Sequence, residues 1–172
     1  MFRSVIIASA AILTISTAAA AADAPTDPQI AHIAYTAGNL DIAAGKQALA
    51  KSHNKAVRDF AQQMVRDHTA VNNKALALVK KLHVTPADNP TSQALTKAAA
   101  AERAKLAKMS GAPFDREYVN NEVAFHKTVN GALENTLIPS AKNGELKSLL
   151  ETGLTLFKEH QAHAEQVAKE LK

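Results

Sequence analysis

One stretch of the 172-residue chain combines a helical apolar stripe with two ionisable residues in the middle of that stripe. Residues 114–137 read FDREYVNNEVAFHKTVNGALENTL. At about 100° per residue, five aliphatic side chains fall on one face of a helix: Val119, Val123, Val129, Leu133 and Leu137. Glu122 and His126 share that face. A buried carboxylate and a buried imidazole cost much desolvation free energy unless they have a partner, so the sequence predicts a core that supplies one.

The rest of the chain after residue 22 also favours helices. Alanine is abundant, β-branched runs are few, and glycine and proline stand at boundaries. We expect four long helices at about 28–51, 54–83, 114–137 and 143–171, with an additional, shorter helix at about 91–109. The first two are joined by a short connection and should pack as antiparallel neighbours.

These elements predict an all-α fold, a ferritin-like four-helix bundle with an additional helix in the crossover. The apolar face of the helix at 91–109 is mostly alanine, so we expect it on the outside of the bundle. If this crossover returns the chain to the end where the second helix began, the helices at 54–83 and 114–137 run parallel. Residues 23–172 then form a single helical-bundle domain.

Each of the four long helices carries at least one inward-facing ionisable residue. The set comprises Asp41, His68, Glu122, His126 and His160. At about 1.5 Å per residue, the predicted topology places all of them within about 12 Å of bundle length. Imidazole and carboxylate are ligands of transition metals such as Fe, Zn, Mn, Ni and Cu, and a set rich in histidine suits these ions better than Ca or Mg. The sequence therefore predicts a transition-metal site in the bundle core.

The same residues have a second interpretation. Glu122 and His126 can form a buried ion pair, with Asp41 and Asn130 completing a hydrogen-bonded network that sets the register of the helices. No phosphate loop, nucleophile elbow, cysteine nucleophile or H-E-x-x-H motif is present. The sequence therefore favours a protein without enzymatic activity, and any activity would have to be carried by the metal.

Residues 1–22 have the composition of a secretory signal peptide. Arg3 precedes an alanine-rich apolar run that ends in the small residues Ala20-Ala21-Ala22. We expect cleavage there and a periplasmic location, with no integral membrane segment after cleavage; an uncleaved membrane anchor is the alternative. The absence of cysteine fits an exported protein that needs no disulfides. The net charge of +4 comes from mixed charges without a basic block, which disfavours nucleic-acid binding.

Three segments resemble an exported bacterial family called domain of unknown function 4142, whose members are often labelled outer membrane proteins. They span residues 39–76, 111–129 and 146–167, and their most specific parts are M-V-x-D-H-T and F-D-x-x-Y. The resemblance covers about 27–171 and implies a ferritin-like four-helix bundle with a central metal site. The matching positions are those of the inward-facing set: Asp41, His68, Glu122, His126 and His160.

Ferritin-like di-iron sites use a Glu from each of two helices and Glu-x-x-His from each of the other two. This chain has Glu122-x-x-x-His126 and an isolated His68 instead, so we expect a mononuclear or histidine-rich site. Two functions remain open. One is a periplasmic protein that stores, buffers or senses a transition metal, with a link to stress; the other is a non-enzymatic envelope interaction module whose polar core is structural only. The sequence identifies no protein partner.

Overall fold

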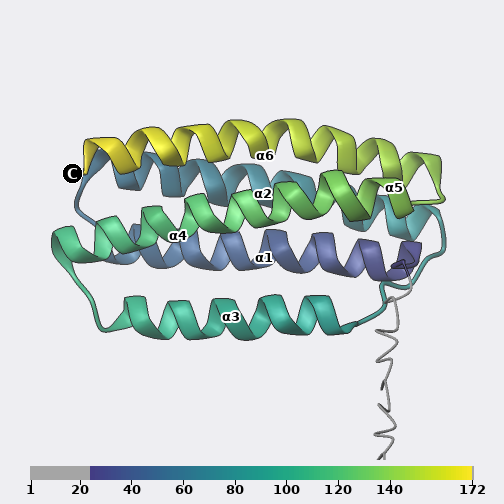
Figure 1. The fold of residues 1–172 in the computed structure, drawn as a ribbon, viewed down its shortest axis with the longest axis horizontal. Helices are drawn as coiled ribbons and strands as arrows, with labels where there is room; N and C mark the ends of the chain where they lie inside the picture. Colours follow the sequence, from purple (N-terminus) through teal and green to yellow (C-terminus); the bar gives the residue numbers. More distant parts are fainter. Residues whose placement is uncertain (1–23, 172) are drawn as a thin grey trace, which may run out of the picture.

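A computed structural model describes residues 24–171, and within this range the secondary structure is helical without strands (Figure 1). The all-α prediction is therefore confirmed. The elements are α1 (Asp27–Lys51), α2 (Lys55–Lys81), α3 (Pro90–Ala107), α4 (Gly111–Ala132), the π-helix η1 (Leu133–Leu137), α5 (Ile138–Ser140) and α6 (Gly144–Glu170). The predicted signal peptide, residues 1–22, lies outside the described residues.

Side-chain caps fix where the helices begin. The Asn54 side chain accepts a hydrogen bond from the Val57 amide at the start of α2. Asn89 forms a reciprocal capping box with Ser92 at the start of α3, with Pro90 in the first turn. Asn143 accepts from two amides of the first turn of α6. Each cap satisfies amide groups that have no partner inside the helix, which explains why the helices start where the sequence suggested.

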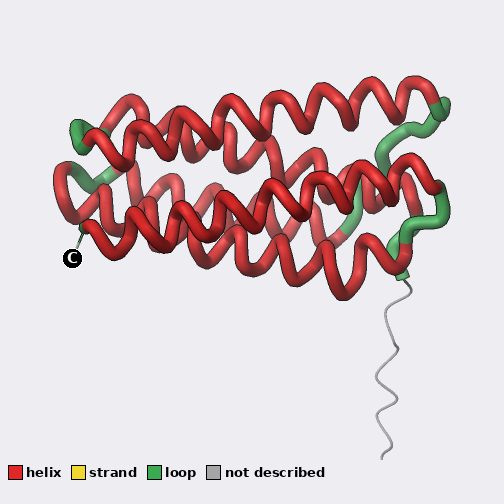
Figure 2. Tube along the Cα trace, turned by 90° about the horizontal axis from the view of Figure 1, so that it is seen from above, coloured by secondary structure: helices red, strands yellow, loops and turns green. Residues whose placement is uncertain are grey.

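The four long helices α1, α2, α4 and α6 lie side by side, and α3 lies along one side of them (Figure 1). The loops gather at the two ends of the bundle (Figure 2). Helices α1 and α2 run in opposite directions, and α3 returns the chain to the end of the bundle where α2 began. Helices α2 and α4 therefore run in the same direction (Figure 1). This is the topology expected from a returning crossover. The prediction that the crossover helix packs outside is also confirmed, because only Ser92 and Leu106 of α3 are buried.

The predicted helix at 114–137 differs from the structure at both ends. It begins at Gly111, which has a φ of 60°; Pro113 is tolerated because the first turn of a helix needs no amide hydrogen from it. At the other end the chain continues through η1 and past Pro139 to Ser140. The wider π turn accommodates Pro139, whose ring would clash with the carbonyl group four residues earlier in a regular α-helix.

The buried core falls into two apolar clusters. One is built around Val57, Phe60, Met64, Tyr118 and Val167. The other, toward the end of the bundle that carries α5, is built mainly from aliphatic residues, among them Ile30, Ile33, Leu133, Leu146 and Leu150. The five predicted site residues occupy intermediate positions along their helices, between the residues of the two clusters. The site therefore forms a polar layer across the middle of the bundle.

Close packing of α1 on α2 sets the position of two site residues. A Cβ atom at Gly45 would lie 3.0 Å from the Ala61 carbonyl oxygen of α2. A Cβ atom at Gly38 would lie 2.4 Å from Asn72 Oδ1. The absence of side chains at these positions lets the two backbones approach, and it brings Asp41 of α1 next to His68 of α2.

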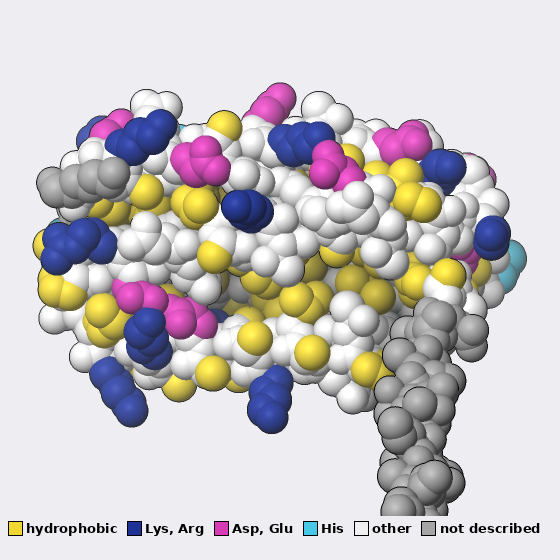
Figure 3. Space-filling model, viewed as in Figure 1, with side chains coloured by type: hydrophobic (Ala, Val, Ile, Leu, Met, Phe, Trp, Pro, Cys, Tyr) yellow, Lys and Arg dark blue, Asp and Glu magenta, His cyan; other side chains and the backbone are white. Residues whose placement is uncertain are grey.

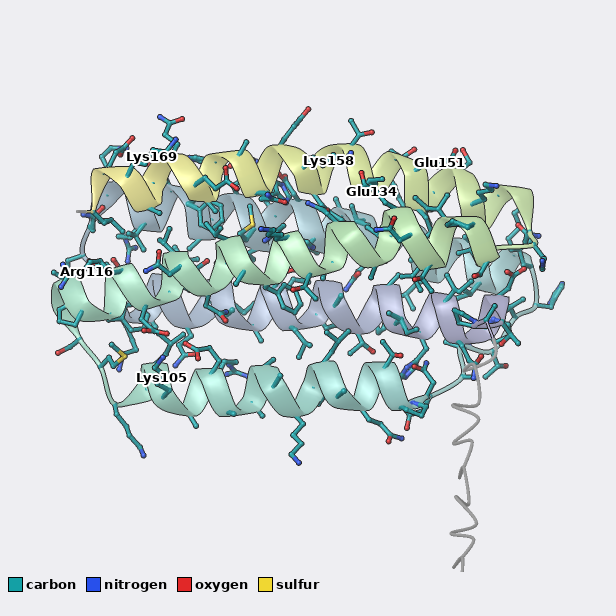
Figure 4. All side chains as sticks on the ribbon, in the orientation of Figure 1. Lys105, Arg116, Glu134, Glu151, Lys158 and Lys169 are labelled. Carbon is teal, nitrogen blue, oxygen red and sulfur yellow. The ribbon has the colours of Figure 1, made fainter. Side chains whose placement is uncertain are left out.

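The outside of the bundle carries charged side chains, and one contact fastens a loop at the α5 end. The labelled lysine, arginine and glutamate side chains in Figure 4 are exposed and come from α3, α4, η1 and α6. At the α5 end, both carboxylate oxygens of Asp27 accept backbone hydrogen bonds, from Lys142 and Asn143, at 2.8 Å each. This contact holds the loop before α6 against the start of α1. Among the described residues, none of the helices combines the length and apolarity needed to cross a bilayer.

Candidate metal centre

The structure buries all five residues that the sequence singled out for a metal site. Their exposed fractions lie between 0% and 4%, so their polar atoms are almost inaccessible to water. They come from four helices: Asp41 from α1, His68 from α2, Glu122 and His126 from α4, and His160 from α6.

These residues form two overlapping groups that share His126. In the first group, His68, His126 and His160 each offer one ligand atom, and these atoms lie within 4.8 Å of one another. In the second group, Asp41, Glu122 and His126 do the same. One ion placed between the atoms of either group could bind them if the side chains moved closer together, because nitrogen and oxygen ligands lie about 2.0–2.2 Å from such an ion.

The three imidazole rings form a compact triangle. The ring centres of His68 and His160 lie 5.2 Å apart, and each of them lies 5.6 Å from the ring centre of His126. Phe157 stacks on His68 at 4.8 Å with an angle of 12° between the planes. Because this stacking covers one face of the ring, it restricts the rotation of His68 and keeps its nitrogens in the plane of the site.

Hydrogen bonds fix the tautomers of two of the imidazoles. His126 Nδ1 lies 3.0 Å from the backbone carbonyl oxygen of Glu122, which can only accept, so Nδ1 carries the proton and donates. His160 Nε2 lies 3.1 Å from Asp67 Oδ2 and donates to that carboxylate. The other nitrogen of each ring, His126 Nε2 and His160 Nδ1, is buried without a hydrogen-bond partner. Metal-binding histidines are held in this way, by a carbonyl or carboxylate on the nitrogen that does not bind the ion.

His68 is less constrained. Neither of its ring nitrogens has a hydrogen-bond partner, although Nε2 lies 3.4 Å from Asp41 Oδ2. Buried polar atoms in proteins are normally paired, and the described part of the site leaves four imidazole nitrogens and Glu122 Oε2 unpaired. This concentration of unpaired atoms in one layer points to a ligand that completes the site.

Burial keeps the carboxyl groups of the site protonated. It raises the pKa of Asp41 from 3.8 to about 8, although a hydrogen bond with Glu122 acts in the opposite direction. Burial, and then the charge of Asp41, raise the pKa of Glu122 well above its ordinary value. Both carboxyl groups are therefore mainly protonated at neutral pH when no cation lies near them. A divalent cation bound here would replace those protons.

The imidazoles are held neutral by the same effect. Burial lowers the pKa of His126 to about 4, with the neighbouring His160 adding to the shift and the hydrogen bond to the Glu122 carbonyl opposing it. Burial lowers the pKa of His68 well below its ordinary value, and His126 and His160 lower it further. Burial also lowers the pKa of His160, against the opposing effect of Asp67. Neutral imidazole is the form that binds metal ions.

Two cavities reach the site from different sides. One, of about 380 Å³, lies under α3 and extends to Asp41 and Glu122. The other, of about 570 Å³, extends from the α5 end of the bundle to Asp41, His68 and His126. Both cavities therefore border residues of the polar layer, from the α3 side and from the α5 end.

Sequence analysis missed two residues that complete the centre. Helical periodicity places Asp67 on the flank of its apolar stripe, but its carboxylate accepts from His160 Nε2 and orients that ring. Arg66 Nε donates to the other oxygen of Asp67 at 2.9 Å. The D-H pair at 67–68 in the M-V-x-D-H-T segment could have indicated this role. Helical periodicity places Phe157 in the apolar stripe of α6 and does not reveal that its ring stacks on His68.

Several neighbouring residues do not join the set. Asn130 donates to Gln161 and to the Phe157 carbonyl of α6, so it does not complete a network with Glu122 as the structural interpretation required. His163 pairs with Gln63 through Nδ1 at 2.7 Å and packs edge-on against Phe60. The polar layer is therefore centred on the five predicted residues.

Residues 13–167 match the profile of a family described as domain of unknown function (DUF4142). The chain belongs to the DUF4142 family. The resemblance expected from the sequence is thus confirmed, and the match contains all five residues of the polar layer. No curated protein and no solved structure matches this DUF4142 chain. The ferritin-like relationship therefore stays a prediction, and the function has to be argued from the site itself.

Proposed function

We propose that this DUF4142 protein binds one transition-metal ion in its polar layer. His68, His126 and His160 would bind the ion, with Asp41 and Glu122 as further ligands or as the charge that balances it. The observation that carries the proposal is the arrangement of His126 and His160: each donates from one ring nitrogen to a fixed acceptor and leaves the other nitrogen buried and unpartnered.

The chemistry of the donor set indicates the class of ion. Three neutral imidazoles with two carboxyl groups suit borderline divalent ions such as Fe, Zn, Mn, Ni or Cu. Ca and Mg prefer sites made of oxygen ligands. An ion held in this way would be stored, buffered or sensed, and we place this role in the periplasm, in keeping with the predicted signal peptide.

The competing interpretation is an envelope interaction module whose polar core only sets the helix register. A structural network of that kind gains its stability from satisfied hydrogen bonds. Here Glu122 Oε2 lies 3.6 Å from His126 Nδ1, as the expected ion pair requires. However, Glu122 Oε2 and four imidazole nitrogens lack hydrogen-bond partners, and Asn130 bonds elsewhere. These features favour the ion-binding proposal.

The test is metal binding by untagged protein, with the metal-free form prepared by chelation. Calorimetric titration with Mn, Fe, Co, Ni, Cu and Zn ions should give one site per chain for at least one ion, and the absorption spectrum of the Co²⁺ form should report nitrogen ligands. His126→Ala and His160→Ala should abolish this binding. His53→Ala is the matched control, because His53 is exposed in the connection between α1 and α2. One-site binding that survives both core substitutions would refute the proposal, as would the absence of binding for every ion.

A further inference from the structure

The larger cavity provides far more space than a metal ion needs. It measures about 570 Å³ and lies among α1, α2, α4, η1 and α6. Its walls are largely aliphatic, including Ile33, Ala37, Ala75, Leu133 and Leu150. The start of α3 also lines it, through Pro90, Thr91 and Leu95. Figure 3 shows a hollow lined by hydrophobic side chains above α3, in the half of the molecule that carries α5. Cavities of about 300–1,000 Å³ hold small organic ligands.

Three residues of the polar layer are among those that line this cavity. They are Asp41, His68 and His126. Both imidazoles are at least 97% buried, with exposed fractions of 3% and 1%, and each has a ring nitrogen without a partner. Binding sites for small molecules combine predominantly apolar walls with a few polar groups that fix the orientation of the ligand. The cavity therefore fits a ligand with a long apolar part and a polar group at one end.

The π-helix η1 forms part of the wall of this cavity. Leu133, Thr136 and Leu137 of η1 line it. A π turn inside a helix is rare and is frequently found at functional sites, because it changes the direction of the side chains that follow. In the view of Figure 1, α4 is close to α1 at its start and nearer to α6 at its end. This divergence from α1 coincides with the half of the bundle that contains the cavity.

We propose that the cavity binds a linear aliphatic carboxylic acid, with its chain between the helices and its carboxylate at the polar layer. The carboxylate would take a coordination position on the ion held by His68 and His126, and this part of the inference rests on the proposed function. The chain is recognised by the aliphatic walls alone. A metal site built from protein ligands can leave one position free for such a group.

Binding of octanoate, decanoate and dodecanoate to the zinc-loaded protein tests the inference by calorimetry. Each added methylene should lower the dissociation constant by about fourfold, which corresponds to about 0.8 kcal/mol for each buried CH₂. Dodecanol, which lacks the carboxylate, should bind at least about tenfold more weakly than dodecanoate. Without zinc, dodecanoate should bind no more tightly than dodecanol. The dissociation constants of the acids should still fall with chain length.

A variant that fills the cavity provides the structural control. Ala75 lines the cavity from α2, whereas Ala77 of the same helix is exposed and does not. Ala75→Leu should weaken dodecanoate binding about tenfold and leave zinc binding unchanged. Ala77→Leu should change neither. Far-ultraviolet circular dichroism checks that both variants fold. If Ala75→Leu does not fold, the chain-length series on the wild-type protein tests the inference by itself.

The outcomes separate this inference from the proposed function. Zinc binding without dodecanoate binding, or dodecanoate binding that does not depend on chain length, would overturn the inference and leave the metal site intact. Chain-length-dependent binding in a protein that binds no metal would refute the metal site and the role of the carboxylate, and would support the chain site alone.

Discussion

Replacement of His126 by leucine should have opposite effects on the metal-free and the metal-bound protein. The His126 side chain is 1% exposed, and its Nε2 has no partner. An unsatisfied buried polar group costs about 1–3 kcal/mol, and the hydrogen bond from Nδ1 to the Glu122 carbonyl contributes about 1 kcal/mol. Leucine removes both and fills a similar volume. We therefore expect His126→Leu to raise the free energy of unfolding of the metal-free protein by about 1 kcal/mol.

The metal-bound state should respond in the opposite direction. An ion present at about one hundred times its dissociation constant stabilises the folded protein by about 2.7 kcal/mol. In a domain of about 150 residues, that is a rise of roughly 5–11 °C in Tm. His126→Leu removes the ligand that the two groups of the site share, so this rise should disappear.

Urea denaturation followed by circular dichroism, with and without zinc at pH 7.5, measures both effects. His53→Leu is the matched control, since an exposed imidazole should affect neither measurement. A loss of 2 kcal/mol or more in the metal-free variant would show that the imidazole is a satisfied part of a structural network. Retention of the zinc-dependent rise would show that His126 does not bind the ion.

Three further perturbations test separate parts of the structure. The metal-free wild type should become less stable relative to Asp41→Asn as the pH rises from about 4 to about 8, because unfolded Asp41 ionises at its ordinary pKa of 3.8 while burial keeps the folded group protonated up to about 8; urea denaturation across this range measures the difference. Asp67→Ala removes the group that orients His160 and should weaken metal binding about 10–100-fold in a calorimetric titration, with the fold unchanged. Gly45→Ala should lower Tm, because the added Cβ would lie 3.0 Å from a backbone oxygen of α2, whereas Gly131→Ala has no atom within 4 Å and should add about 0.5–1 kcal/mol of stability; a rise in Tm for both variants would refute the close packing of α1 on α2.

Helical periodicity was sufficient to find the polar layer. Asp41, His68 and His160 each interrupt an apolar stripe, and a side chain in such a position has to enter the core whatever the neighbouring helix contributes. The helix starts at about 54, 91 and 143 could be predicted for a similar reason, because the caps that fix them, Asn54, Asn89 and Asn143, act within a few residues of sequence. Both kinds of feature depend on local sequence alone.

Features that depend on contacts between helices could not be predicted in this way. The role of Asp67 requires the angle at which α2 faces α6, and the stacking of Phe157 on His68 requires the same information. The π turn shifts the register of α4 without disturbing its apolar stripe, since both Leu133 and Leu137 are still buried. The cavity is lined by residues from several helices, and no single apolar stripe records how these helices are spaced.

The position of the polar layer between two apolar clusters has a consequence for the cooperativity of unfolding. Each cluster draws on a different part of the helices, and the layer between them contains buried nitrogens that lack hydrogen-bond partners. Amide hydrogens in the half near α5 should then exchange with solvent through local openings that leave the other half folded. A ligand that joins α1, α2, α4 and α6 at this level would couple the two halves into one cooperative unit and slow that exchange.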